Sequence, residues 1–432
     1  MQSLFVCRLA AIVIFFLNSA IVTANDVSIF LEKNQKGTWS VTYNSLKPVK
    51  SIVFKRSPDN SREKRWKPTS KAFRFKYDGN IEKVARVDGE SFKQVTFLLE
   101  ATYTSLPKEY APFSPYSDGG MLFHTGRFFA CADICLPQNN QWSIKVKSAK
   151  SDNIVVRGQI HTEKAEWVDG DDGIKVYVGR ATPQHDSNFV SVIDQNLPEV
   201  LKSEISSQLP LLMNFFALNM SELEYRPALF ASYSSTNDGT FGHKGGTLPK
   251  QIFLHWYGDK AIEGINNDEV FWFFSHEVAH LFQREGADIS DLKDHWVHEG
   301  AADFFAGLAF EAIHESELFK YKLKRSQEAC LSALKGSPQY STSSKKNPRL
   351  HYDCGLLIMN AINYELEHFD SMDMFGLWGL YIKRVQNGAR AGASEFLNTA
   401  EPYLSSEFYI SLRKLQDDSF NAFEFFESLK PH

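Results

Sequence analysis

Two histidines and a glutamate lie in the middle of an otherwise apolar segment, FWFFSHEVAHLFQREG, which spans residues 271–286. His276 and His280 are four residues apart, so in a helix their imidazoles stack on one face at a separation suited to one metal ion. Glu277 is rotated about 100° from His276 and about 60° from His280, so its carboxylate can approach a water at the metal without being a ligand. Buried polar groups of this kind need a partner, and a cation supplies one.

A third ligand and a supporting carboxylate follow in HWVHEGAADFFAGLAF, residues 295–310. Eighteen residues separate His280 from Glu299. Catalytic zinc sites use three protein ligands and keep a fourth position open, and a carboxylate commonly completes a pair of histidines. Asp303 lies one helical turn beyond Glu299, where it can bond the free nitrogen of a ligand histidine and fix its tautomer. A purely structural zinc site would need a fourth protein ligand, so the pattern disfavours it.

Two crossing helices must position these side chains. Asn and Asp residues at 266–268 precede the apolar residues of the first segment, and Gly286 follows them, which predicts where a helix starts and stops. Its apolar side chains point in nearly every direction, so we expect protein all around it. The apolar pattern after Glu299 predicts a second helix.

The remaining elements fall into two parts, which predicts an α+β fold. Residues 25–170 contain short alternating runs such as DVSIFLE, TWSVTYN and WSIKVKS, separated by turn-rich pieces such as SPYSDGG, and this pattern predicts an N-terminal all-β domain. Residues 171–432 begin with one more strand, IKVYVG, and then become mostly helical. Three exceptions are the loop SSTNDGTFGHKGG, the strand QIFLHWYG and the polar linker SPQYSTSSKKNPR, which predict a small sheet and two breaks.

Composition limits the class of protein. With 432 residues and 43% hydrophobic content, the chain can bury a large core and exceeds the usual size of one domain. The formal net charge of -5 gives no reason to expect a nucleic-acid partner. A basic cluster at residues 61–76, SREKRWKPTSKAFRFK, suits a polyanion or membrane-surface contact, but a solvated strand face or loop explains it more simply.

The first residues predict a secretory signal peptide, residues 1–24. Arg8 precedes an apolar run from Leu9 to Val22, and small residues stand at the cleavage positions before a cut after Ala24. An uncleaved membrane anchor is the alternative, but the run is short for a spanning helix, and no later segment is long enough to span a bilayer. We therefore expect a secreted or periplasmic protein without a stable membrane span.

Four cysteines remain after the leader, and in an oxidising compartment they allow three pairings. We expect the pairs closest in sequence, Cys131 with Cys135 and Cys330 with Cys354. Free buried thiols are the alternative.

The pattern HExxH, an 18-residue spacer and a glutamate inside WVHEG resembles the gluzincin metallopeptidases, in particular the aminopeptidase N branch and the related glycyl aminopeptidases. Asp303, four residues after Glu299, also resembles the thermolysin arrangement. The strong resemblance covers residues 271–308, and the order of a β domain and then a catalytic domain is the order of that branch. It implies a thermolysin-like catalytic domain at 171–432.

The resemblance also implies roles for individual residues. One Zn²⁺ ion would be bound by His276, His280 and Glu299, with Glu277 as the general base. In the aminopeptidase N branch a tyrosine in a YxKG-like sequence stabilises the oxyanion, and here YDCG begins at Tyr352, with Cys in place of Lys. An ordinary tyrosine at a helix start is the alternative, and either His351 or His298 is a further candidate for the role.

One position departs from the family. Exo-acting members carry a Gly-x-x-Glu element whose glutamate binds the free amine of the substrate. The corresponding segment begins at Gly245, and Thr247, Leu248, Pro249 and Lys250 offer no carboxylate. Aminopeptidase specificity therefore does not follow for this chain, although the strand can still pair with an extended peptide.

Together these features predict a zinc-dependent peptidase that acts on peptides or proteins through a metal-activated water. Two alternatives stay open: a zinc hydrolase that acts on a non-peptide amide, and an inactive metallopeptidase-like protein that binds peptides or cell-envelope components. Manganese or cobalt would fit the same ligands.

Overall fold

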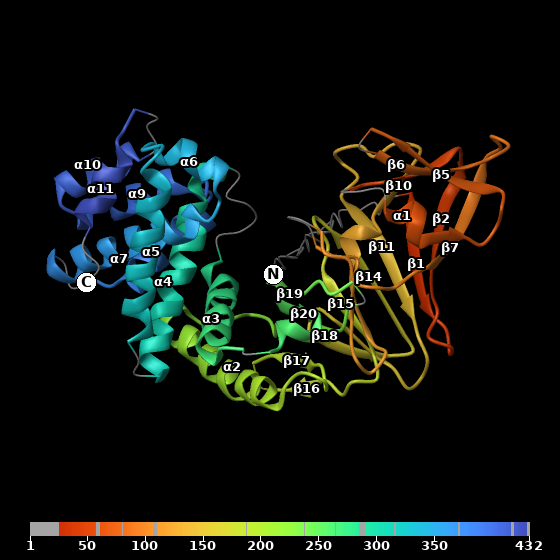
Figure 1. The fold of residues 1–432 in the computed structure, drawn as a ribbon. Helices are drawn as coiled ribbons and strands as arrows, with labels where there is room; N and C mark the ends of the chain where they lie inside the picture. The colour runs from red at the N-terminus through yellow and green to blue at the C-terminus, as the bar shows by residue number, and fades with distance from the viewer. Residues whose placement is uncertain are drawn as a thin grey trace, which may run out of the picture.

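The computed structural model describes residues 26–57, 61–79, 81–106, 110–186, 188–236, 238–263, 265–284, 291–314, 317–369, 372–415 and 419–429. The predicted signal peptide lies outside these residues. Strands dominate the first part of the described chain and helices the last part, and Figure 1 shows the two on opposite sides of the molecule. The predicted α+β architecture is confirmed. Among the helices that the structure describes, none is both long enough and apolar enough to cross a bilayer.

Two sheets, in which most neighbouring strands pair antiparallel, form the outer part of the β domain. The first has the strand order β14-β11-β1-β2-β7-β4 and the second the order β10-β3-β6-β5. Every second residue of β1 is buried from Val27 to Leu31, as the alternating sequence predicts. The strands are β1 (Val27–Lys33), β2 (Trp39–Val49), β3 (Ser51–Phe54), β4 (Trp66–Pro68), β5 (Phe73–Asp78), β6 (Ile81–Arg86), β7 (Phe92–Leu99), β10 (Ala130–Ala132), β11 (Gln141–Lys147) and β14 (Lys164–Gly170).

A third sheet, with the order β13-β12-β15-β9-β8, joins the β domain to the rest of the chain. Its strands are β8 (Phe113–Pro115), β9 (Met121–His124), β12 (Asn153–Val156), β13 (Gln159–Thr162) and β15 (Lys175–Gly179). Strand β15 is the IKVYVG segment that the sequence placed at the start of the second domain, yet it pairs with β12 and β9. This pairing favours a boundary after Gly179 rather than after residue 170.

A fourth sheet, with the order β16-β17-β18-β20-β19, lies beside the helices. Strands β17, β18 and β20 are parallel neighbours, and β19 pairs antiparallel to β20 at the edge. A small apolar cluster that includes Tyr177, Phe230 and Phe253 packs this sheet against the third one. The strands are β16 (Gln184–His185), β17 (Val190–Ile193), β18 (Ala228–Ser234), β19 (Gly242–Leu248) and β20 (Gln251–Tyr257).

Strand β19 begins inside the segment that the sequence predicted to be a Gly-rich loop. The reason is close packing: a side-chain carbon added at Gly245 would lie 2.5 Å from the Phe273 ring of the neighbouring helix. Only glycine lets the backbone of the edge strand come this close to the helix that carries the histidines.

The helical part surrounds the two histidine- and glutamate-bearing helices. Its helices are α2 (Glu199–Met220), α3 (Asn267–Gln283), α4 (His295–His314), α5 (Leu318–Leu334), α6 (Tyr340–Lys346), α7 (Leu350–Phe369), α8 (Met374–Gln386), α9 (Ala393–Ala400), α10 (Ser406–Lys414) and α11 (Ala422–Ser428). Helices α4 and α7 touch where Gly300 faces Gly355, since a side-chain carbon added at Gly300 would overlap the backbone of Gly355. This contact brings the N-terminal turns of α4 and α7 together.

Helix α6 corrects the prediction of a polar linker before α7. Its serines are buried rather than solvated, and Ser343 Oγ donates to Ser337 O at 2.8 Å. Tyr340 OH lies 3.1 Å from His351 Nδ1. Internal hydrogen bonds therefore satisfy polar side chains that the sequence pattern assigned to solvent.

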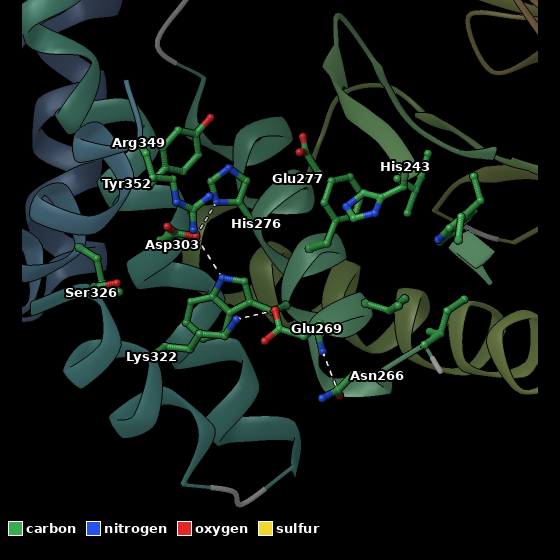
Figure 2. A pocket seen from close by; sticks show the side chains of 18 of the residues that line it. His243, Asn266, Glu269, His276, Glu277, Asp303, Lys322, Ser326, Arg349 and Tyr352 are labelled. Carbon is green, nitrogen blue, oxygen red and sulfur yellow. Dashed lines mark hydrogen bonds and ion pairs between the residues drawn. The ribbon is translucent and has the colours of Figure 1, made fainter. Parts of the chain in front are cut away.

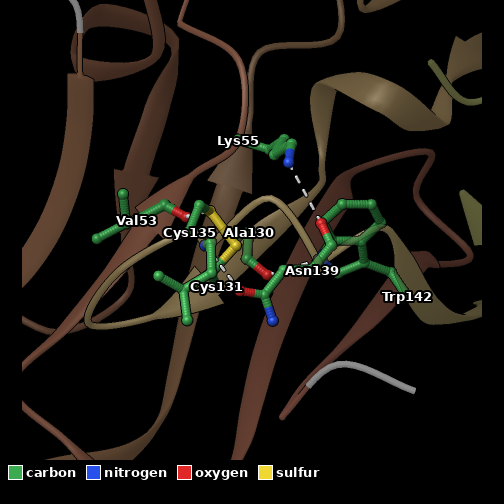
Figure 3. The surroundings of a disulfide bond; sticks show 8 residues. Val53, Lys55, Ala130, Cys131, Cys135, Asn139 and Trp142 are labelled. Atoms are coloured by element: carbon green, nitrogen blue, oxygen red, sulfur yellow. Dashed lines mark hydrogen bonds between the residues drawn. A yellow bond between two sulfur atoms is a disulfide. The ribbon is translucent and has the colours of Figure 1, made fainter. Parts of the chain in front are cut away.

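Both predicted disulfides are present. Cys131 bonds to Cys135 and Cys330 to Cys354, with Cα atoms 5.2 Å apart in each pair. Figure 3 shows the first pair beside Val53 of β3. The second pair links α5 to the start of α7.

The basic cluster at 61–76 is spread over several elements rather than one strand face. It forms the short helix α1 (Ser61–Arg65), strand β4 and most of β5. Arg62 points inward, where its guanidinium pairs with Glu82 and lies 4.4 Å from the Phe54 ring centroid. Part of the cluster therefore stabilises the core of the β domain.

Candidate metal centre and cleft

Helix α3 positions the two histidines. Its N-cap is Asn266, whose side-chain oxygen accepts from the backbone N–H of Asp268 at 2.9 Å, as the start signal predicts. The helix is buried on nearly every side, which confirms the expectation from its apolar pattern. Its last residue is Gln283 and its C-cap is Arg284, which takes a left-handed conformation, while the predicted stop residue Gly286 lies outside the described residues.

The three predicted ligand side chains converge. His276 Nε2 lies 2.9 Å from His280 Nε2, and Glu299 Oε2 lies 3.3 Å from each of these nitrogens. One donor atom from each residue falls within 4.8 Å of the others. Helices α3 and α4 therefore present two imidazoles and one carboxylate to a common point.

The charges at this point suit a cation. Among the described residues, Glu299 Oε2 is buried and has no hydrogen-bond partner of good geometry. Burial alone would lower the pKa of His276, but the carboxylates of Asp303 and Glu299 outweigh it and raise this pKa. Burial alone would raise the pKa of Glu299, but the two imidazoles outweigh it and lower this pKa. The cluster thus stabilises positive charge, and its donor set is one that zinc prefers.

Asp303 lies where the sequence predicted a supporting carboxylate. Its Oδ1 atom is 2.9 Å from His276 Nδ1 and accepts a hydrogen bond from Trp272 Nε1 at 3.1 Å. The contact to Nδ1 leaves Nε2 of His276 directed at Glu299 and His280. Asp303 therefore fixes the orientation of one imidazole.

Gln283 does the same for the other imidazole, and the sequence analysis did not single it out. Its Oε1 atom lies 2.6 Å from His280 Nδ1, and its Nε2 donates to the carbonyl of His298 at 2.8 Å. The side chain is fully buried. The available signal was a polar residue three positions after His280, on the same face of an apolar helix.

Glu277 stands beside the cluster without joining it. The hydroxyl of Thr247 on β19 lies 2.7 Å from Glu277 Oε2 and 2.9 Å from the Glu277 carbonyl. The sequence analysis named Thr247 only for its lack of a carboxylate, so this contact is new. It places the edge strand and the carboxylate in direct contact.

Tyr352 lies in the first turn of α7, close to the metal ligands. Its ring stacks on His276 with the centroids 5.6 Å apart. Burial raises the pKa of Tyr352, and the negative charge of Glu299 raises it further, so the phenol keeps its proton.

Two histidines were the other candidates for the role of oxyanion partner. His351 is buried against Tyr340. His298 stacks on His280 at 4.1 Å.

Two cavities meet at this centre. The Trp272 cavity has a volume of about 580 Å³ and runs along the N-terminal half of α3 to Arg349 and Lys322, as Figure 2 shows. The Lys250 cavity has a volume of about 890 Å³ and lies beside Gly245–Lys250 and the C-terminal end of α3. His276, Glu277 and Tyr352 line both cavities.

Sequence comparisons find no relative: no protein-family model matches the chain, and no curated protein does. Solved structures do match. An M1 zinc metallopeptidase mutant from Deinococcus radiodurans, bound to a Tyr-Ser-Ala substrate, superposes with a TM-score of 0.52 and 12% identity over 92% of this chain and 94% of that one. An aminopeptidase N family protein from Idiomarina loihiensis gives a TM-score of 0.58 and 11% identity over 90% and 75%.

Yeast LTA4 hydrolase in complex with bestatin gives a TM-score of 0.52 and 13% identity over 94% of this chain and 68% of that one. Identities this low show shared architecture only. The resemblance seen in the sequence motif is therefore confirmed at the level of structure: this chain has the fold of the M1 zinc metallopeptidases, from its β domain through its helical part.

Proposed function

We propose that this chain is a zinc-dependent peptidase that uses Glu277 as its general base. The observation that carries the proposal is the convergence of His276, His280 and Glu299 beside Glu277, at the junction of two cavities. The shared fold with M1 zinc metallopeptidases supports it.

The residues divide the chemistry among them. Zinc held by the two imidazoles and the Glu299 carboxylate would polarise the scissile carbonyl and acidify a water. Glu277 accepts a proton from that water at its carboxylate and delivers it to the departing amine. Tyr352, which stays protonated, donates a hydrogen bond to the oxygen that gains negative charge.

Strand β19 supplies the means to hold an extended peptide. It stands at the edge of the fourth sheet in the strand order of the described residues, and its residues line both cavities, with His243 in one and Gly245 and Gly246 in the other. Backbone pairing to an edge strand accepts many sequences, because it reads the main chain. A peptide on this edge would pass the metal centre with residues on both sides of the cleaved bond.

We also propose that the protein acts outside the cytosol. The two disulfides are compatible with an oxidising compartment, and the predicted leader would direct the chain there. Amino-terminal sequencing of the protein from its source cells should find Asn25 as the first residue. A mature chain that begins at Met1 would contradict this part of the proposal.

Metal removal and restoration test the peptidase assignment. Protein stripped with a chelator, and shown by elemental analysis to be metal-free, should not cleave a mixed peptide pool, and one equivalent of zinc should restore cleavage. Glu299→Gln should lower both zinc content and cleavage, whereas Glu63→Gln, the same change on an exposed residue of α1, should alter neither. Undiminished cleavage by metal-free protein would overturn the proposal. Zinc-loaded protein that cleaves no peptide would instead favour a non-peptide amide or a binding role.

A further inference from the structure

The Lys250 cavity carries positive charge. Its described lining includes the ammonium of Lys250 and the guanidinium of Arg284. The carboxylates in the described lining are Glu277 and the ligand candidate Glu299, and both belong to the metal centre. A substrate ammonium would therefore meet cations on this side of the centre, and a substrate carboxylate would find partners there.

The backbone holds both cationic residues in an uncommon conformation. Lys250, in the turn after β19, has a φ of 64°, and Arg284, at the end of α3, has a φ of 56°. Side chains other than glycine seldom adopt this left-handed region, and such residues gather at functional sites. Here two separate elements bring such residues to one cavity.

Contacts fix the directions of the two side chains. Lys250 Nζ lies 5.0 Å from the centroid of the Tyr225 ring, which itself lines the cavity. Arg284 Nη2 donates to the carbonyl of Ser221 at 3.2 Å and also to that of Glu222. Lys250 is exposed to solvent, but its ammonium lies over a ring of the cavity wall, and Arg284 is anchored to the chain that follows α2.

Leu248 removes another place for a substrate amine. It is the last residue of β19, only 6% exposed, and it packs with Phe253 in the apolar cluster between the third and fourth sheets. An ammonium group that approached this end of the edge strand would meet a hydrocarbon side chain. The cavity wall thus offers apolar contact and positive charge.

The Trp272 cavity differs in its charge. It contains Glu263 and Glu269, and Lys322 Nζ pairs with Glu269 at 2.6 Å. Arg349 lies 3.6 Å from the carboxylate of Asp353. Cations in the described lining on this side are matched by carboxylates, whereas the described carboxylates on the Lys250 side are those of the metal centre.

Strand direction relates the charge to the substrate. Antiparallel pairing is more stable and more frequent than parallel pairing, and β19 already pairs antiparallel to β20. A peptide antiparallel to β19 runs from Leu248 toward Gly242, so its amino-terminal part enters the Lys250 cavity and its carboxyl-terminal part enters the Trp272 cavity.

We propose that the Lys250 cavity binds a carboxylate on the amino-terminal side of the cleaved bond. The substrates would then be peptides cut internally, shortly after an acidic residue, rather than peptides trimmed from a free amino terminus. This inference rests on the proposed peptidase function and adds its substrate class.

Matched peptides test the inference. Four peptides of one sequence carry either Glu or Lys in the two positions before the cleaved bond, each with a free or an acetylated amino terminus. We expect the wild-type protein to cleave the Glu peptides with a kcat/KM about tenfold higher than the Lys peptides, and to cleave acetylated and free forms alike. Lys250→Glu should reduce the preference to about twofold or reverse it. Lys64→Glu, the same change on an exposed residue of α1, should leave it unchanged.

Binding gives a second readout that does not depend on turnover. Isothermal titration of the zinc-loaded Glu277→Gln variant should show tighter binding of the Glu peptides, and Lys250→Glu in that background should abolish the difference. Glu277-dependent cleavage with a preference for Lys, for a free amino terminus, or for acidic residues after the bond would overturn the inference alone. Cleavage that shows the same Glu preference in Lys250→Glu would also overturn it. Absence of both cleavage and binding for all four peptides would overturn the inference together with the proposed function.

Discussion

Thr247 on the edge strand places its hydroxyl 2.7 Å from the carboxylate of Glu277 on α3. The contact depends on Gly245, since a side chain there would collide with Phe273 and push β19 away from the helix. The strand that would bind the peptide therefore also orients the carboxylate that would accept a proton. The Thr247 hydroxyl thus links the position of a bound peptide to the position of the Glu277 carboxylate.

Replacement of this hydroxyl should slow turnover. Thr247→Val keeps the shape but removes the donor, and hydrogen bonds to charged groups are worth about 1.5–3 kcal/mol, so we expect kcat to fall by about tenfold or more. Thr247→Ser should retain most of the activity, and zinc content should stay the same in both variants. Steady-state kinetics of the three proteins measure this. Equal kcat values for the Val and Ser variants would show that the contact has no part in the reaction.

Loss of a supporting residue should weaken metal binding. Asp303→Ala frees His276 Nδ1, and Gln283→Ala frees His280 Nδ1. Because such partners fix ligand orientation, each change should raise the zinc Kd by about 10- to 100-fold. Competition with a chromogenic chelator measures the Kd, with Glu63→Gln on α1 as the control. Unchanged affinity in both variants would mean that the ligands are held by packing alone.

Removal of the Tyr352 hydroxyl tests the proposed oxyanion partner. Donors of this kind contribute about 2.7–4 kcal/mol, so Tyr352→Phe should lower kcat by about a hundredfold or more. The ring that stacks on His276 remains, so zinc affinity should not change. A loss of less than about threefold would exclude the role and direct attention to His298, which lines the same cavity.

Lys175 should make the stability of the fold depend on pH. Burial lowers its pKa from 10.5 to about 7, and the charge of Arg127 acts in the same direction. Between these two values the unfolded chain binds more protons at this position than the folded chain does, so the free energy of unfolding rises with pH across that window. In Lys175→Met this contribution is absent. The stability of the variant relative to the wild type should therefore be higher at pH 7 than at pH 9.5, whatever the constant effect of losing the hydrogen bond from Lys175 Nζ to Ala111 O.

Urea denaturation at several pH values measures this difference. Lys64→Met, at an exposed residue of α1, is the control for removal of a lysine. A stability difference between Lys175→Met and the wild type that stays constant from pH 7 to 9.5 would contradict the prediction.

The sequence predicted the parts of the centre that depend on local spacing. His276 and His280 had to share a helical face, and the asparagine cap and the disulfide pairs also followed from near neighbours. Contacts across elements were harder to predict. Thr247 meets Glu277 only because β19 approaches α3, and the Trp272 contact with Asp303 requires two helices to cross. No periodicity along the chain encodes such contacts.

Errors in the fold prediction have the same origin. The IKVYVG strand looked like the start of a new domain because VDGDDG precedes it, but pairing with β9 and β12 decides its sheet. The serine-rich segment that forms α6 looked solvated because its polar groups find partners only after the chain has folded. Tertiary pairing, not local composition, settled both cases.

The most direct test of the central claim is cleavage of a mixed peptide library by the zinc-loaded wild type and the zinc-loaded Glu277→Gln variant, read by mass spectrometry. Glu63→Gln, at an exposed residue of α1, controls for the change of a carboxylate to an amide. The account predicts new internal peptide termini with the wild type and with Glu63→Gln, and none above background with Glu277→Gln. Equal cleavage by the Glu277→Gln variant, or no cleavage by the zinc-loaded wild type, would contradict it.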